Sequence, residues 1–163
     1  MTWKPWLVMR SLAAFPMCSW HSNTTVSGSP TDVLALLTEP DAIARWAPVP
    51  FEVLALDGTR LESGSRARVA GRLAGRSVEF DVDVLRASHE RFELVAQGPI
   101  CIDVKYRVRP TGAASEVEAS IAVEGRGLFG RTLAKATEAL LAGGALRMSL
   151  ERLAREVRPA LAA

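Results

Sequence analysis

The chain has few of the side chains that build metal centres and catalytic clusters. Its 163 residues include two cysteines and two histidines, and Cys18 and Cys101 belong to no metal-binding spacing. No zinc set can be assembled from them, so we expect neither a metal nor another cofactor. Reduced thiols in a cytoplasmic protein are the simplest expectation for the two cysteines.

An excess of one charge and a long hydrophobic run are also missing. The net charge is only +2, and much of the arginine faces acidic residues in the strand pairs predicted below. No one-sided basic stripe is left for nucleic acid. The apolar stretch within residues 1–16 is interrupted by Arg10 and closed by Pro16. It is far shorter than the roughly 20 residues of a membrane helix, and no clear signal-peptide cleavage site follows. We therefore expect no nucleic-acid partner and no stable membrane insertion.

The length suits one domain with a substantial core. Met17 stands where a compact domain would begin, and no linker, tandem repeat or low-complexity tract interrupts the sequence after it. We interpret residues 1–16 as a loose N-terminal extension, for which disorder is preferred over an amphipathic surface contact. Residues 17–159 are predicted to form a single domain.

Three successive hairpins can be assembled between residues 66 and 124, with turns at 74–75, 98–99 and 110–115. Each hairpin places its charges on one face and its apolar groups on the other. Side chains alternate along a strand, and a one-residue slip would reverse every face. The agreement predicts an antiparallel sheet with one salt-bridged face and one apolar face. The predicted cross-strand pairs are Arg68–Asp81, Arg66–Asp83, Val69–Phe80, Ala67–Val82, Glu93–Lys105, Leu94–Val104, Phe92–Tyr106, Arg107–Glu118, Arg109–Glu116, Val104–Ile121 and Tyr106–Ala119.

Two more strands and two short helices precede these hairpins. Strands are predicted over residues 18–26 and 51–56. Between them, Ser29 provides a cap for a helix over residues 31–37, and a second helix follows over residues 40–46.

Residues 127–158 predict one long helix, because apolar residues recur at spacings of three and four. A helix of this length buries its apolar stripe most simply along the apolar face of the sheet. The order of elements therefore predicts an α+β fold.

Several short segments occur in the same order as these elements. They are residues 26–33, 39–41, 46–48, Gly58, Gly64, Arg91, 106–108, 150–153 and Glu156. With the element order, they resemble the helix-grip superfamily known as START-like or SRPBCC, and within it the polyketide cyclase/dehydrase and lipid-transport branch. The resemblance covers about residues 18–158.

The resemblance implies a curved antiparallel sheet of about seven strands wrapped around a long C-terminal helix, with two short helices after the first strand. A cavity is expected between sheet and helix. Members of the superfamily bind sterols, lipids, plant hormones or polyketides. Some cyclise or dehydrate polyketide chains, and others bind protein partners. The fold alone does not choose among these activities.

The side chains on the apolar face of the sheet either line such a cavity or pack together as a filled core. Their spacing in the sequence does not distinguish a cavity from a filled core. The adjacent Gly143 and Gly144 each cost about 1 kcal/mol relative to alanine within a helix. Close contact with the sheet, a bend, or space for a ligand would each explain them. The candidate ligand-binding residues are Trp46, Phe51, Val69, Phe80, Val82, Phe92, Leu94, Val104, Tyr106, Ile121, Leu140, Gly143 and Gly144.

Inward acids and bases are scarce. Tyr106 is the only candidate catalytic residue, as a donor of a hydrogen bond or a proton, and a core phenol is the alternative. Ser22 and Thr24 could orient a carbonyl, whereas His21 is expected to face solvent. The acids of residues 79–83 are interpreted as surface ion pairs rather than as general acids or bases.

The leading hypothesis is a cytoplasmic protein that binds a small hydrophobic ligand, such as a lipid or a polyketide-like molecule, between sheet and helix. A pocket of about 300–1,000 Å³ with few polar groups would suit it. One alternative is an enzyme of the polyketide cyclase/dehydratase type. Another is a protein-interaction module without a small ligand.

Overall fold

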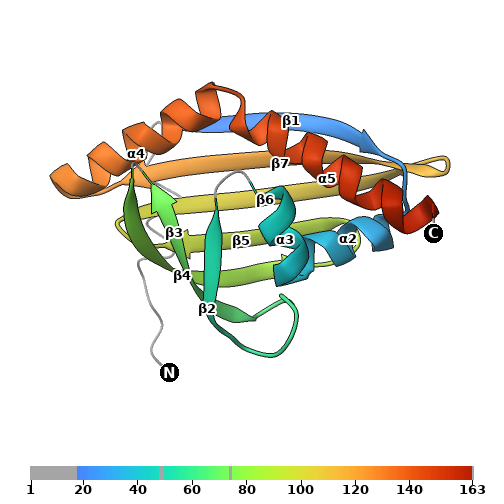
Figure 1. Cartoon of the computed structure of the whole chain (residues 1–163), viewed down its shortest axis with the longest axis horizontal. Coiled ribbons are helices and arrows are strands. Elements are labelled where there is room, and N and C mark those ends of the chain that lie inside the picture. Colours follow the sequence, from blue (N-terminus) through green and yellow to red (C-terminus); the bar gives the residue numbers. More distant parts are fainter. Residues whose placement is uncertain (1–17, 48–49, 74, 163) are drawn as a thin grey trace.

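The computed structural model describes residues 18–47, 50–73 and 75–162 (Figure 1). The predicted extension over residues 1–16 and half of the predicted turn at 74–75 lie outside the described residues. In chain order the elements are β1 (Cys18–Val26), α2 (Pro30–Thr38), α3 (Pro40–Trp46), β2 (Phe51–Leu56), β3 (Arg66–Leu73), β4 (Arg76–Ala87), β5 (Arg91–Gln97), β6 (Ile100–Thr111), β7 (Ala114–Gly125), α4 (Gly127–Ala142) and α5 (Ala145–Ala162).

The strands of the described chain form one seven-stranded antiparallel sheet in the order β1-β7-β6-β5-β4-β3-β2. Every cross-strand pair predicted for the three hairpins is present in the observed register. β1 pairs with β7, and β2 pairs with β3 as the opposite edge. The helices lie across one face of the sheet (Figure 1). The predicted α+β helix-grip fold is confirmed.

Ion pairs on the outer face of the sheet follow the register in the first hairpin and depart from it in the third. Arg109 contacts Glu118 at 2.6 Å, although its direct neighbour across the strands is Glu116. Arg107, which faces Glu118 directly, is left without an ion pair among the described residues. Long exposed side chains reach diagonal neighbours as readily as direct ones. The two ion pairs that match the prediction are Arg66–Asp83 at 3.3 Å and Arg68–Asp81 at 3.2 Å.

The prediction of one unbroken helix over residues 127–158 is wrong, because the chain turns at Gly143 and Gly144 between α4 and α5. Gly144 has a φ of 95°, a left-handed conformation that glycine adopts without steric cost. A Cβ at Gly143 or Gly144 would meet only atoms of the neighbouring helical turns. The bend therefore explains the glycine pair, and close contact with the sheet does not.

The start of α2 follows the predicted capping chemistry. The Ser29 hydroxyl accepts a hydrogen bond from the Asp32 backbone N–H at 3.2 Å, and the Asp32 carboxylate accepts one from the Ser29 N–H at 3.1 Å. This reciprocal pair is a capping box, which stabilises the first helical turn. At the end of α3, the Trp46 indole N–H donates to the Leu36 carbonyl at 3.0 Å and so fixes the orientation of the ring.

α5 is held firmly against α3 and the sheet. Its stripe of Leu146, Leu150, Leu153 and Val157 is buried. The buried Ser149 hydroxyl donates to the Trp46 carbonyl at 2.8 Å, and Arg45 of α3 pairs with Glu156 at 2.9 Å. No helix in the described part of the chain combines the length and the apolar character needed to cross a membrane.

Candidate ligand-binding site

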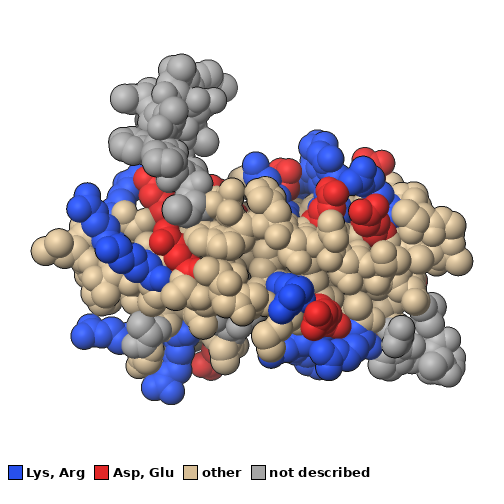
Figure 2. All heavy atoms as spheres, turned by 90° about the horizontal axis from the view of Figure 1, so that it is seen from above, with Lys and Arg blue, Asp and Glu red and all other residues tan. Residues whose placement is uncertain are grey.

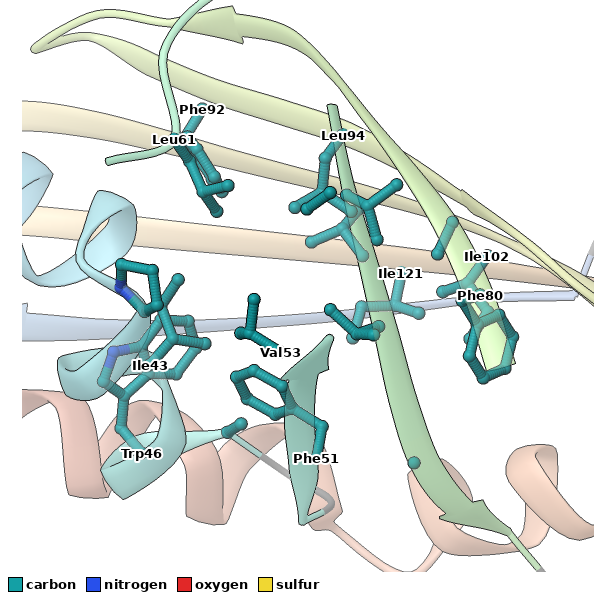
Figure 3. Close-up of a pocket in the computed structure, with 18 of the residues that line it drawn as sticks. Ile43, Trp46, Phe51, Val53, Leu61, Phe80, Phe92, Leu94, Ile102 and Ile121 are labelled. Carbon is teal, nitrogen blue, oxygen red and sulfur yellow. The ribbon is translucent and has the colours of Figure 1, made fainter. Parts of the chain in front are cut away.

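An apolar cavity of about 240 Å³ lies between the sheet and the helices α3 and α4. Its volume falls just below the range of about 300–1,000 Å³ expected for a small-molecule pocket. Figure 3 shows side chains from α3, β2 and the inner face of the sheet converging on this space. At its rim, Leu140 of α4 is 45% exposed, and Phe51 and Val53 of β2 are half-buried. The cavity is therefore accessible between α4 and β2.

Most of the residues predicted to bind a ligand line this cavity, but Gly143 and Gly144 do not. These two form the turn between α4 and α5, and whether they contact a ligand stays a prediction. Whether the remaining residues contact a ligand stays a prediction. The predicted residues in the wall are Trp46, Phe51, Val69, Phe80, Val82, Phe92, Leu94, Val104, Tyr106, Ile121 and Leu140.

Further wall residues were missed by sequence reasoning. Those on the sheet share the inward parity of predicted neighbours: Ala67 precedes Val69 by two positions, and Ile102 precedes Val104 by two. Leu61 lies in a loop, where no periodic signal exists, and its N–H donates to the Thr38 carbonyl at 2.9 Å. The missed residues are Pro40, Ile43, Ala47, Val53, Leu56, Leu61, Ala67, Gly71, Leu73, Ala96, Ile102, Thr137, Leu141 and Ala145.

The wall offers almost no chemistry for proton transfer. None of the described lining residues is Asp, Glu, His, Lys, Arg or Cys. The Thr137 hydroxyl donates to the Leu133 carbonyl at 2.9 Å, and the Trp46 indole N–H is likewise satisfied. Polar side chains of the wall other than Tyr106 are thus already paired within the protein.

Tyr106 is the exception. The residue is only 3% exposed, and its ring meets the Trp46 ring edge-on, with centroids 5.8 Å apart. Burial raises the pKa of the Tyr106 phenol above its ordinary value, so the hydroxyl stays protonated. This hydroxyl makes no hydrogen bond among the described residues, and it is not one of the side-chain oxygens that are fully buried. Because Tyr106 also lines the cavity, its hydroxyl is the candidate donor to a bound molecule.

The other predicted candidates lie elsewhere. His21 is exposed, as expected, and Ser22 and Thr24 are half-buried on β1 but do not line the cavity. Asp81 and Asp83 are ion-paired on the outer face, so their interpretation as surface charges is confirmed. In the residues that the structure describes, no group of three His, Cys, Asp or Glu side chains is arranged to hold a metal ion.

A curved antiparallel sheet packed against helices, with an apolar cavity between them, defines a helix-grip protein of the START-like class. Sequence comparison supports the same class at a finer level. The family described as polyketide cyclase / dehydrase and lipid transport matches residues 17–158, and the chain belongs to this family.

Solved structures share the fold at low sequence identity. A START superfamily protein from Mycobacterium smegmatis has a TM-score of 0.64 and 18% identity, over 86% of this chain and 97% of that one. The Zhui aromatase/cyclase from Streptomyces sp. R1128 has a TM-score of 0.63 and 15% identity, over 87% and 94%. A search of curated protein sequences gives no match. Family and fold together indicate a hydrophobic-ligand-binding or polyketide cyclase-type protein.

Proposed function

We propose that the protein binds a small, largely apolar molecule in the cavity, with the Tyr106 hydroxyl donating a hydrogen bond to a carbonyl or similar acceptor of the ligand. The observation that carries this proposal is that this hydroxyl, alone among the polar side chains of the described wall, has no hydrogen-bond partner there. Burying an unpaired hydroxyl costs roughly 1–3 kcal/mol on protein mutational scales. A ligand acceptor would offset this cost and would also fix the orientation of the ligand.

The apolar wall supplies the rest of the binding energy. Side chains that line an empty cavity lack dispersion contacts on one side, and a ligand of matching shape restores them. Cavities of this character stay dry and accept aromatic or aliphatic molecules. The edge-on pair of Trp46 and Tyr106, with Phe92 beside it, suits a flat, ring-containing ligand.

A second candidate function is catalysis on a polyketide-like substrate, favoured by the same hydroxyl. Tyr106 could polarise a carbonyl while the cavity shape folds the chain. The phenol is held in its protonated form, and no carboxylate or imidazole in the described wall could accept a proton. This role would therefore be restricted to orientation and hydrogen bonding, and ligand binding is the better supported function.

A matched pair of substitutions on one strand tests the location of the site. Val53 lines the cavity and is half-buried, whereas its neighbour Leu54 is exposed on the other face of β2. Val53→Phe adds volume inside the cavity, and fitting a ligand beside the larger side chain would cost about 1–3 kcal/mol of binding free energy, as overpacking does in a filled core. We expect Val53→Phe to weaken binding of the neutral fluorescent probe N-phenylnaphthylamine at least about fivefold. Leu54→Phe should leave the affinity unchanged.

Native mass spectrometry of the freshly purified protein complements this titration, because a retained apolar ligand would add directly to the mass. Equal affinity of wild-type and Val53→Phe protein for the probe would place binding outside the cavity. Absence of both probe binding and any retained molecule would contradict ligand binding itself.

A further inference from the structure

Two large apolar side chains are exposed at the start of α4. Leu128 is 85% exposed and Phe129 is 50% exposed. The buried face of the same helix is made by other residues, among them Leu133, Ala134 and Thr137. Adjacent exposed leucine and phenylalanine side chains are unusual in a helix whose other face is well packed.

Cations surround these two side chains. Arg126 and Arg131 are exposed on either side of them, and the Arg76 guanidinium lies over the Phe129 ring, 5.5 Å from its centroid. No acidic residue occurs in residues 70–78 or 125–137. Among the described residues, none of the three arginines makes an ion pair. We call Arg76, Arg126, Leu128, Phe129 and Arg131 together the α4 tip.

The α4 tip stands at one extremity of the molecule. Figure 1 shows α4 beginning at the far left, and Figure 2 shows Lys and Arg side chains around the same end. The backbone beneath it is tightly packed: a Cβ at Gly130 would lie 2.6 Å from the Pro99 carbonyl oxygen, and one at Gly125 would lie 2.8 Å from the Ala134 Cβ. The start of α4 is therefore packed closely on the sheet. Its apolar side chains are exposed although the backbone beneath them is tightly packed.

We propose that the α4 tip docks on an anionic lipid surface, with Leu128 and Phe129 entering the headgroup boundary and the arginines contacting lipid phosphates. Peripheral membrane binding combines buried apolar area with attraction of cations to anionic lipids. The tip supplies both on a protruding helical turn. A groove would suit a protein segment better, and none of the five tip residues lines the cavity.

Docking at the tip does not depend on the proposed cavity ligand, but it would bring the cavity close to the lipid. Arg76 pairs across the strands with Leu73, and Leu73 lines the cavity. One wall of the cavity therefore begins directly at the docking surface.

Vesicle co-sedimentation tests the proposal on the full chain. Vesicles of phosphatidylcholine alone are compared with vesicles of equal parts phosphatidylcholine and phosphatidylglycerol. The wild-type protein should prefer the anionic vesicles, and added salt should weaken this binding. Arg126→Gln/Arg131→Gln should reduce affinity for anionic vesicles about thirtyfold, since each cation near such a surface contributes about fivefold. Leu128→Ser/Phe129→Ser should reduce it as well.

The control pair is Leu85→Ser/Arg86→Gln, which makes the same kinds of change in exposed residues at the opposite end of β4. It should bind vesicles like the wild type. Equal binding to neutral and anionic vesicles, or an equal loss in the control pair, would overturn the proposal. Competition by soluble polyglutamate as effective as that by anionic vesicles would assign the tip to an acidic protein and would also overturn it. N-phenylnaphthylamine binding should be unchanged in every variant. Vesicle binding at the α4 tip is thereby tested independently of ligand binding in the cavity.

Discussion

Replacing Tyr106 with phenylalanine should change stability and ligand affinity in opposite directions. The substitution removes the one hydroxyl that is unpaired among the described wall residues and keeps the ring contacts with Trp46 and Phe92. In the ligand-free protein this hydroxyl is withdrawn from water without a partner, at a cost of roughly 1–3 kcal/mol when burial is complete. Because the hydroxyl is reachable from the cavity, we expect only part of this cost to be recovered, about 0.5–1 kcal/mol of added unfolding free energy.

The loss of affinity should appear only for ligands that carry an acceptor. Acetylnaphthalene and ethylnaphthalene have the same ring system and similar shape, but only the first has a carbonyl oxygen. A net hydrogen bond of about 0.5–1.5 kcal/mol corresponds to a two- to twelvefold change in dissociation constant. Tyr106→Phe should therefore weaken the binding of acetylnaphthalene by about this factor and leave the binding of ethylnaphthalene unchanged. Displacement of N-phenylnaphthylamine measures both constants, and urea unfolding measures the stability.

Thr137→Val provides the matched control at the same cavity. The Thr137 hydroxyl is already bonded to the Leu133 carbonyl, so its removal should not discriminate between the two naphthalenes. The reasoning is refuted if Tyr106→Phe destabilises the ligand-free protein by more than about 1 kcal/mol, because the hydroxyl would then have a protein partner. The reasoning is also refuted if Tyr106→Phe reduces the affinity for both naphthalenes equally.

Three further predictions concern stability. Burial raises the pKa of Tyr106 above its ordinary value of 10.0, so the unfolded chain ionises above that pH while the folded protein keeps its proton. Stability should fall as pH rises beyond about 10, by up to about 1.4 kcal/mol per pH unit from this group, and urea unfolding at graded pH should show a smaller decline in Tyr106→Phe. Gly144→Ala should cost about 1–2 kcal/mol in a left-handed conformation, whereas Gly143→Ala, at a φ of −75°, should be close to neutral; melting temperatures compare the two. Ser149→Ala leaves the Trp46 carbonyl without its 2.8 Å hydrogen bond and should cost about 1–3 kcal/mol in denaturant unfolding, and an unchanged midpoint would contradict this role.

The strand register could be predicted because two independent patterns agree. Arg68 faces Asp81 on the outer face, and the adjacent Val69 faces Phe80 on the inner face. A shift by one residue would place the charges in the core, so burial and charge pairing exclude the same alternatives. The long side chains were less predictable: Arg109 reaches Glu118 diagonally, because exposed ion pairs of similar energy compete within a few ångströms.

The break between α4 and α5 could not be predicted from the periodic pattern of apolar residues. Spacings of three and four continue through Gly143, and they record which face is apolar without recording a change in backbone direction. The double glycine indicated an anomaly, and a bend was one of three explanations for it. Only the positive φ of Gly144 distinguishes a turn from a tightly packed helix.

The side that the inner residues face could be predicted, but the space between them could not. Alternation identifies Val69 and Val104 as inward, yet a cavity remains only where the facing side chains are too small to meet. Ala67, Gly71 and Ala96 stand in the sheet wall and leave that volume open. Whether small residues on several strands oppose one another depends on sheet curvature and helix distance, which no local pattern in the sequence encodes.

The turn at Gly143 and Gly144 separates two tasks that a single helix would have to combine. α4 contributes Thr137, Leu140 and Leu141 to the cavity wall, while α5 carries the buried stripe and the polar links that hold α3. Substitutions that reshape the wall from α4 therefore leave the main anchoring helix untouched. Selection, or an engineer, can vary the range of accepted ligands on one segment while the stability of the fold is maintained by the other.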